Sequence, residues 1–326
     1  MPTTYLPTLS YLATWRNLAI LLALLNLKTL PLAWHFRILF HALRNLRDVK
    51  SLPSFARSTP SIHPLFATHT ISTRTPFLET DYNLHKSNST YFTDLDISRT
   101  GLVFSLLSPG FKSGNTELEA QGHNGRFVVV LGSVHASFRR EIQPYERYEV
   151  RSRLLGWDAK WMVIVSWFVR LARGKKGEEV LLAGALSKYV VKKGRFTVSP
   201  ERSFRHAGLL PERPAEESNG EARGGMEESK WEDVATGNEN GHADMNGHVV
   251  GLTSTAAPDA LGKVVDLDPT AAFAGPKSRE PKPDVKAAEW DWDQIEKERL
   301  RGLELVKGWL ALDGELLQEF SRVLGS

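Results

Sequence analysis

The sequence predicts an α+β domain in which an antiparallel sheet wraps around one long helix. Three observations lead to this fold class. A run rich in Thr, Ile and Phe at 66–78 is typical of a strand, an apolar stripe at helical spacing occupies 91–107, and several extended runs follow it. One long helix with roughly five strands buries its apolar faces by packing the sheet on the helix.

Size and composition place the chain among ordinary globular proteins. It has 326 residues, of which 41% are hydrophobic and 24% are charged, and its formal net charge is +3. The charge is unevenly distributed: residues 1–50 carry six Lys or Arg against one acid, and 211–288 carry eight basic and fifteen acidic residues. The absence of cysteine excludes a disulfide framework, a cysteine nucleophile and a thiolate zinc site.

The first fifty residues have the character of a membrane-associating helical segment. Residues 18–27 are strongly apolar, but a spanning helix needs about 20 such residues. We therefore expect 1–50 to act as a membrane anchor or an interfacial helix, with Trp15, Trp34 and the Arg/Lys cluster at headgroup depth. This would place the protein at the endoplasmic reticulum or another endomembrane. The alternative is a buried helical hairpin that packs on the domain, with a cytoplasmic location.

The central domain is expected at 60–208. After the strand and the helix, residues 108–125 predict a long loop. Turns that contain glycine, at 156–159 and 174–177, predict hairpins between the extended runs. The predicted strands of this part are 126–140, 147–157, 160–171 and 178–192.

The segment 77–99 is the most plausible place for chemistry. Asp81 ends a strand-like run, His85 follows four residues later, and Asn88 stands just before the predicted helix. A carboxylate in a polar turn acts either as a nucleophile or as a general base toward water. The free N–H groups and the dipole at the helix start suit an oxyanion. We therefore treat Asp81 as the candidate catalytic group.

The other polar residues of this segment have less specific roles. His85 would orient substrate or hydrogen-bond the turn, and Asn88 would fix the turn or hold a water molecule. For both, local turn chemistry is the alternative explanation. Asp96 and Arg99 lie three residues apart on the predicted helix, which favours a structural ion pair over catalysis.

The order and spacing of these residues resemble the hotdog thioesterases related to 4-hydroxybenzoyl-CoA thioesterase. The segment 138–150 resembles the second signature of that family, and 153–158 is similar to its membrane-anchored branch in animals and fungi. The sequence also resembles the fungal lcsJ-type thioesterases of secondary-metabolite clusters. The resemblance covers about residues 15–208, and its first motif is Asp81-x3-His85-x2-Asn88-x2-Tyr91-x4-Asp96-x2-Arg99.

This resemblance implies a hotdog fold, with Asp81 at the position of the catalytic acid. It also implies a homodimer with its sites near the interface, and an acyl thioester substrate on coenzyme A or a carrier protein. The setting would be fungal lipid or secondary-metabolite biosynthesis, of polyketides or lipopeptides. Glu79 and Ser87 depart from the family pattern, which has Asp and Asn there. The alternatives are a non-catalytic acyl-binding or scaffold protein at a membrane, and a hotdog dehydratase.

Other chemistries lack their sequence signatures. There is no Gly-x-Ser-x-Gly elbow, no phosphate-binding glycine loop and no dinucleotide fingerprint. His123, His135 and His206 are not at metal-ligand spacing. We therefore expect no cofactor, no metal and no nucleic-acid partner. The basic cluster 192–195 predicts a solvated strand end, or a contact with coenzyme A phosphates.

The last third of the chain divides into two parts. Residues 211–288 are rich in Glu, Gly, Asn, Ala and Pro, and predict a disordered acidic linker. Residues 289–326 predict an amphipathic helix, with Gly314 as a candidate point for a break. This helix would dock on the central domain, bind a partner or lie on a membrane. Its apolar stripe comprises Leu303, Val306, Leu310, Leu317, Phe320 and Leu324.

Overall fold

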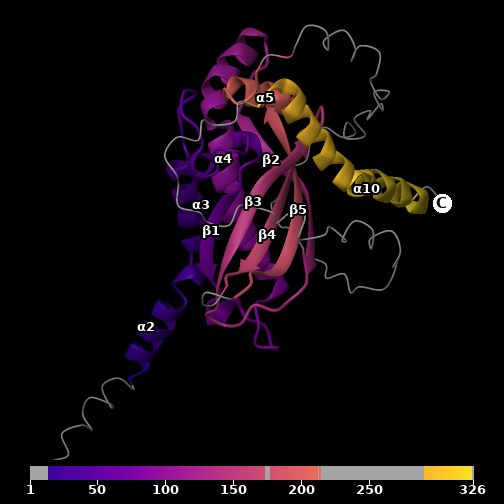
Figure 1. Ribbon diagram of the computed structural model, residues 1–326. Coiled ribbons are helices and arrows are strands. Elements are labelled where there is room, and N and C mark those ends of the chain that lie inside the picture. Colours follow the sequence, from indigo (N-terminus) through magenta and orange to yellow (C-terminus); the bar gives the residue numbers. More distant parts are fainter. Residues whose placement is uncertain (1–13, 173–176, 212, 214–289, 325–326) are drawn as a thin grey trace, which may run out of the picture. The chain divides into compact units, whose positions relative to one another are not determined.

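The structure is a computed structural model, which describes residues 14–172, 177–211, 213 and 290–324. Its centre is an antiparallel sheet with strand order β1-β3-β4-β5-β2, and β6 pairs with the end of β5 (Figure 1). All five predicted strands are present, with ends shifted by a few residues. The strands are β1 (His69–Arg74), β2 (Phe127–Phe138), β3 (Arg147–Trp157), β4 (Trp161–Arg170), β5 (Val180–Lys193) and β6 (Phe196–Val198).

The long helix α4 (Asn88–Ala120) lies against one face of this sheet. Leu95, Leu102 and Leu106 are buried at helical spacing and contribute to the core between helix and sheet. The opposing strand residues include Val150 and Leu154, which are fully buried. An antiparallel sheet that curls around a helix of this length is the hotdog arrangement, so the predicted α+β fold is confirmed.

The predicted loop at 108–125 was wrong, because α4 continues through it to Ala120. Pro109 lies inside the helix and leaves the carbonyl of Ser105 without its usual N–H partner. Arg47 supplies the missing donor, with its Nε 2.5 Å from the Ser105 oxygen. Gly110 is also explained by packing, since a Cβ there would lie 3.0 Å from the backbone nitrogen of Ala207.

The N-terminal segment forms α2 (Trp15–Leu25) and α3 (Ala33–Arg44), joined through a 3-10 turn. No residue of α2 is buried, whereas α3 packs on α4. Within the described ranges, no helix is both long and apolar enough to cross a membrane. The prediction that the basic residues gather at headgroup depth was wrong for three of them. Lys28, Arg37 and Arg47 each make hydrogen bonds to groups of the central domain.

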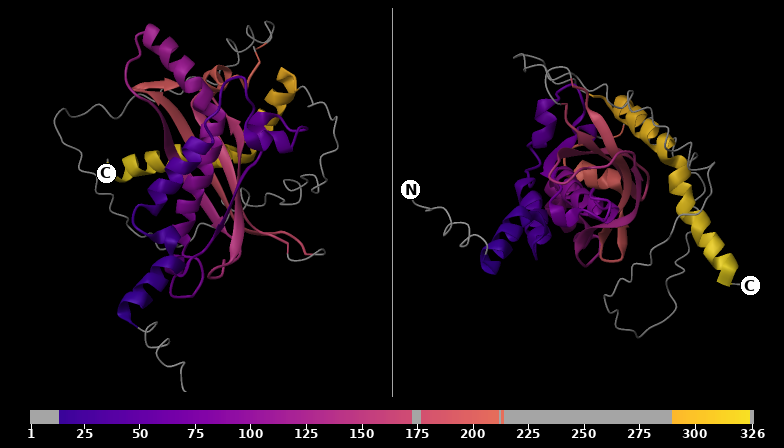
Figure 2. Two further views of the ribbon diagram at one scale, coloured as in Figure 1. Left: turned by 90° about the vertical axis from the view of Figure 1, so that its left-hand side faces the viewer. Right: turned by 90° about the horizontal axis from the view of Figure 1, so that it is seen from below.

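The helix α10 (Trp292–Leu324) covers the other face of the sheet, so β3 to β5 lie between two helical layers (Figures 1 and 2). It approaches β3 closely: a Cβ on Gly302 would lie 1.7 Å from the carbonyl oxygen of Leu155. Arg153 on β3 pairs with Glu298 at 2.6 Å. The helix is unbroken at Gly314, and of the predicted linker 211–288 all but residues 211 and 213 lie outside the described residues.

Short elements complete the fold. A helix, α5 (Pro200–His206), packs on α4, and the 3-10 turns are η1 (Leu27–Thr29), η2 (Ser54–Ser58), η3 (Pro64–Phe66) and η4 (Phe77–Glu79). The hairpin predicted at 156–159 is confirmed, because the Asp158 carboxylate accepts the N–H groups of Lys160 and Trp161 and closes the β3–β4 turn.

The structure tests two predictions about charged side chains, one on the α4 ion pair and one on the basic cluster at the end of β5. The ion pair of Asp96 and Arg99 is confirmed at 2.6 Å, and Arg99 is almost completely buried. The basic cluster at 192–195 is not simply a solvated strand end. Lys193 is buried and pairs with Glu119 at 2.7 Å, so its ammonium group is already engaged within the fold.

Candidate active site

The loop that carries Asp81 is a closed turn that follows β1 and η4. Thr80 and Lys86 pair as an antiparallel bridge, and the N–H of Asp81 donates to the carbonyl of His85 at 3.0 Å. The Asp81 carboxylate accepts the N–H of Asn83 at 2.9 Å, as Asp side chains do in tight turns. Leu84 takes a left-handed backbone conformation with φ of 59°, which allows the chain to reverse.

This turn brings two of the three predicted residues together. The Nδ1 atom of His85 lies 3.6 Å from Oδ1 of Asp81, and about a quarter of each side chain is exposed, 28% for His85 and 24% for Asp81. The imidazole is therefore next to the carboxylate, but beyond direct hydrogen-bond distance of it. Tyr82 and Leu84 are exposed on the same turn, which gives the carboxylate an apolar rim.

Asn88 is the first residue of α4, and its side chain is exposed. In the described structure it makes no hydrogen bond or ion pair with Asp81 or His85. The feature of interest is its backbone. Among the described residues, no acceptor is present for the N–H groups of Asn88 and Ser89, whereas Thr90 N–H bonds to Ser87. Two free donors at the start of a long helix are suited to a developing oxyanion.

A buried cluster of charges lies directly behind this loop. Glu79 and Lys86, which flank the loop, are joined by an ion pair of 2.7 Å. Asp94 of α4 lies 3.1 Å from Lys86 and accepts the Tyr148 hydroxyl at 2.6 Å. Lys28, from the connection between α2 and α3, pairs with both Glu79 and Asp94 at 2.8 Å. The cluster thus contains two ammonium groups and two carboxylates.

The electrostatics of the cluster keep the Asp94 carboxylate charged. Burial raises the pKa of the Asp94 carboxyl, but Lys28, Lys86 and the Tyr148 hydroxyl outweigh that effect and bring the pKa down to about 2. Burial also lowers the pKa of Lys28, against the attraction of Asp94 and Glu79. Glu79 is therefore held as one half of a salt bridge, and is a poor candidate for the attacking carboxylate.

Sequence reasoning did not identify this cluster. Lys28 directly follows the apolar run 18–27, and Asp94 belongs to no motif that indicates a site. A signal was nevertheless present, because a lone Lys within an apolar run requires either an interface or a buried acid as its partner. Nothing in the sequence indicated that the partner would lie 51 and 66 residues away.

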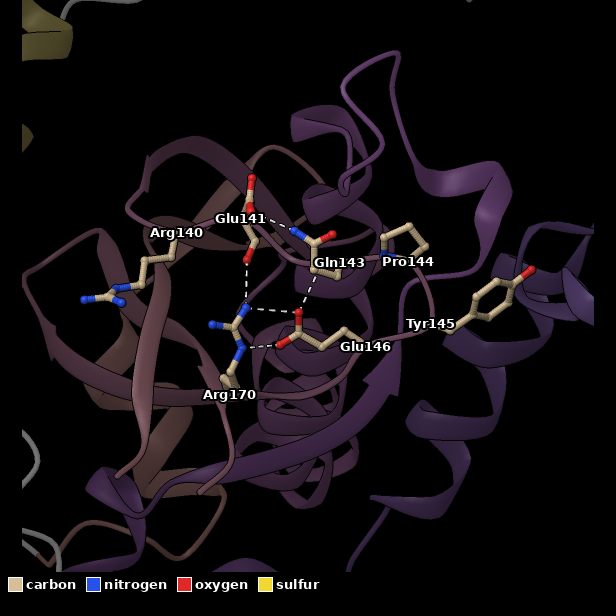
Figure 3. A pocket seen from close by; sticks show the side chains of 7 residues that line it. All are labelled: Arg140, Glu141, Gln143, Pro144, Tyr145, Glu146 and Arg170. Atoms are coloured by element: carbon tan, nitrogen blue, oxygen red, sulfur yellow. Dashed lines mark hydrogen bonds and ion pairs between the residues drawn. The ribbon is translucent and has the colours of Figure 1, made fainter. Parts of the chain in front are cut away.

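An open depression of about 920 Å³ lies beside the same loop, where β2 connects to β3 (Figure 3). Its wall is continuous with the Asp81 loop, since the N–H of Lys86 donates to the carbonyl of Ile142 at 2.8 Å. Arg170 is bound within it to Glu146, whereas Arg140 points outward (Figure 3). None of the three predicted residues lines the depression. Its lining residues are Arg140, Glu141, Gln143, Pro144, Tyr145, Glu146 and Arg170.

Among the described residues, no three His, Asp or Glu side chains are arranged to hold a metal ion. The three histidines considered above have separate surroundings. His206 lies 3.0 Å from Glu117, His123 stacks on Phe196 at 3.8 Å, and burial lowers the pKa of His135 on β2.

Comparison with known proteins gives consistent matches. Residues 75–192 match the model of the Thioesterase-like superfamily. The chain is 34% identical to thioesterase lcsJ of Purpureocillium lilacinum, over 95% of this chain and 94% of the relative. It is also 34% identical to a probable thioesterase of Saccharomyces cerevisiae, over 62% and 82% respectively. A solved probable thioesterase of Escherichia coli, YbaW, aligns with 44% of this chain and 99% of its own, with 15% identity and a TM-score of 0.32.

Proposed function

The chain belongs to the Thioesterase-like superfamily, and we propose that it hydrolyses an acyl thioester with Asp81 as the reacting carboxylate. The observation that carries this proposal is the position of Asp81. Its carboxylate is held by a closed turn, is partly accessible, and precedes a helix start with two free N–H donors. A reacting group and an oxyanion site are therefore close in the chain, on elements that a buried core supports.

In the proposed reaction the thioester carbonyl is bound near the start of α4. Asp81 either removes a proton from an attacking water molecule or attacks the carbonyl carbon itself. The carbonyl oxygen becomes negative and accepts hydrogen bonds from the N–H groups of Asn88 and Ser89. The C–S bond then breaks, and the thiolate takes up a proton and leaves as the thiol. On the general-base route, the proton that Asp81 took from water supplies the thiol, and the carboxylic acid leaves directly. On the nucleophilic route, the thiolate takes its proton from solvent, and a second step, in which water hydrolyses the anhydride between the acyl group and Asp81, releases the carboxylic acid. His85 serves in this scheme to orient Asp81 or the substrate.

The substrate class is an acyl group on coenzyme A or on a carrier protein. We propose a role in fungal lipid or secondary-metabolite biosynthesis, which is the setting implied by the sequence resemblance. Exposed apolar side chains around the turn, Phe77, Leu78, Tyr82 and Leu84, suit an acyl chain better than a polar substrate.

We propose that the active form is a homodimer. In the part of the chain that the structure describes, β2 is an edge strand paired with β5, and it exposes Val128 and Val130 by 40% and 45%. An apolar edge of this kind favours pairing with a second copy. Light scattering of the purified chain should give the mass of a dimer, and Val130→Glu should shift it toward a monomer. A monomeric wild type at high concentration would contradict the proposal.

We also propose that the N-terminal helices lie on a membrane surface. Leu18, Leu21 and Leu25 of α2 are each about half exposed, and Trp15 is 84% exposed. Such a helix is stabilised by an interface. Replacing the three leucines by Ser should abolish sedimentation with vesicles of phosphatidylcholine and phosphatidylserine. A control that replaces Leu300 and Leu316 of α10 by Ser should still sediment, and equal binding by both variants would refute the assignment to α2.

The catalytic assignment is tested with a panel of acyl-coenzyme A and acyl-carrier thioesters. Asp81→Asn should lower kcat by about 100-fold or more, because general-base catalysis contributes at least that much. Asp48→Asn changes an exposed acid elsewhere on the chain, and should leave kcat unchanged. Equal activity of Asp81→Asn and wild type would exclude Asp81. Acyl binding without turnover on every substrate would instead favour the acyl-binding alternative.

A further inference from the structure

We propose that Lys28 is a positioning residue of this site, whose ammonium group completes a buried ion-pair cluster that holds the Asp81 loop closed. We call this cluster the clamp; its members are Lys28, Glu79, Lys86 and Asp94. The expected effect of Lys28 on turnover rests on the proposed function. The claim that Lys28 holds the loop closed does not depend on it. Lys28 lies 47 residues before the segment that matches the family model, which begins at residue 75. The site would thus depend on the segment 1–50, whose sequence predicts a membrane-associating helical segment.

The clamp acts at the base of the loop. Glu79 and Lys86 enter and leave the turn, and their side chains are joined at 2.7 Å with exposures of only 6% and 0%. The backbone supports the same closure, because the N–H of Ser87 donates to the carbonyl of Glu79 at 2.8 Å. Opening this pair would separate the two ends of the segment that presents Asp81.

Lys28 is needed because Glu79 has few other charge partners. Without Lys28, the cation beside the Glu79 carboxylate would be Lys86, which Glu79 shares with Asp94, whereas Asp94 would also have Arg37 at 3.5 Å. Asp94 would keep the Tyr148 hydroxyl, whereas the Glu79 carboxylate would retain only a shared lysine. A buried carboxylate with too little compensation takes up a proton or moves toward water, and either change weakens the loop closure.

The chain around Lys28 is built to hold this position. Asn26 is fully buried, accepts the N–H of Leu78 at 2.9 Å and donates to the carbonyl of Leu22 at 2.8 Å. Lys28 itself also donates to the carbonyl of Arg74 at 3.1 Å. The connection between α2 and α3 therefore contacts both ends of the segment 74–79. These contacts fix the ammonium group beside the carboxylates.

The test compares Lys28→Met, which keeps the length of the side chain, with Lys28→Arg, which keeps the charge. Lys50→Met is the matched control, since Lys50 is exposed in the same segment. Lys28→Met should lower kcat by about 10- to 100-fold with little change in KM, because a displaced catalytic group loses about that much. Lys28→Arg should recover most of this loss. Should Lys28→Met not fold, Lys28→Gln carries the same comparison.

Amide hydrogen exchange of the full chain gives a readout that does not need activity. In Lys28→Met, the amides of 81–87 should exchange at least about tenfold faster than in wild type, while those of β4 and β5 stay unchanged. Unchanged exchange in the loop would overturn the clamp, and so would a uniform increase across the sheet, which marks a general stabilising role. If wild type hydrolyses none of the thioesters, the proposed function fails, but the exchange result still decides the clamp.

Discussion

The substitution Arg47→Met should destabilise the fold mainly through one carbonyl group of α4. Pro109 has no N–H to offer to the carbonyl of Ser105, four residues earlier in the helix. The Arg47 guanidinium bonds to that oxygen, and also to the carbonyls of Ala207 at 3.1 Å and Ser51 at 2.7 Å. No carboxylate pairs with it in the described structure, and burial lowers its pKa to about 10.

The expected loss of unfolding free energy follows from the carbonyl groups that Arg47→Met leaves without a hydrogen-bond donor. Ser105 and Ala207 are buried, and an unsatisfied buried carbonyl costs about 1–3 kcal/mol. We therefore expect Arg47→Met to lower the free energy of unfolding by about 3 kcal/mol. The change Pro109→Ala restores an N–H for Ser105. In that background Arg47→Met should cost about 1 kcal/mol less, so the two substitutions should couple.

Urea unfolding of the wild type, both single variants and the double variant, at one pH, measures this coupling. Arg44→Met serves as the control, because Arg44 is exposed and lies over the ring of Phe40 at 5.8 Å, and it should stay within about 0.5 kcal/mol of wild type. Additivity of the two substitutions within about 0.5 kcal/mol would show that Arg47 does not replace the missing helical donor.

Three further outcomes test other parts of the fold. Burial lowers the pKa of His69 to about 4, so the unfolded chain binds a proton first as the pH falls below 6.5. Unfolding measurements should show about 2–3 kcal/mol less stability from this residue at pH 4.5 than at pH 7, and His69→Gln should flatten that dependence. Gly302→Ala should raise protease sensitivity of α10, because its Cβ would meet the Leu155 carbonyl; an unchanged digestion pattern would contradict this close packing. Leu84→Gly should raise the melting temperature, since only glycine adopts φ of 59° without strain, which is worth about 1 kcal/mol; a lower melting temperature would refute that reasoning.

The sheet and the central helix could be predicted because their signals are local. Alternating or continuous apolar runs separated by turn residues placed β2 to β5 within a few residues. The spacing from Asp81 to Tyr91 placed the turn before α4, and the side chains of Asp81 and His85 do meet there. Periodicity and turn chemistry are properties of short segments, so the sequence carries them directly.

The remainder of α4 could not be predicted, because its local signals point the other way. Pro109, Gly110 and Gly114 are typical of a loop, but each is accommodated by a residue distant in sequence. Arg47 replaces the donor that Pro109 lacks, and α5 packs against the two glycines. Long-range packing therefore overrode the local preference, and no reading of 108–125 alone would have revealed it.

Long-range contacts also engage half of the cations in the basic N-terminal segment. Of its six cations, Lys28, Arg37 and Arg47 bind groups of the central domain, and only Arg16, Arg44 and Lys50 are left for a membrane surface. Binding to lipid would then depend more on exposed leucines and Trp15 than on charge, and should respond weakly to salt. A steep loss of vesicle binding at high ionic strength would contradict this division of roles. The segment is better regarded as part of the folded domain that also presents an apolar surface on α2.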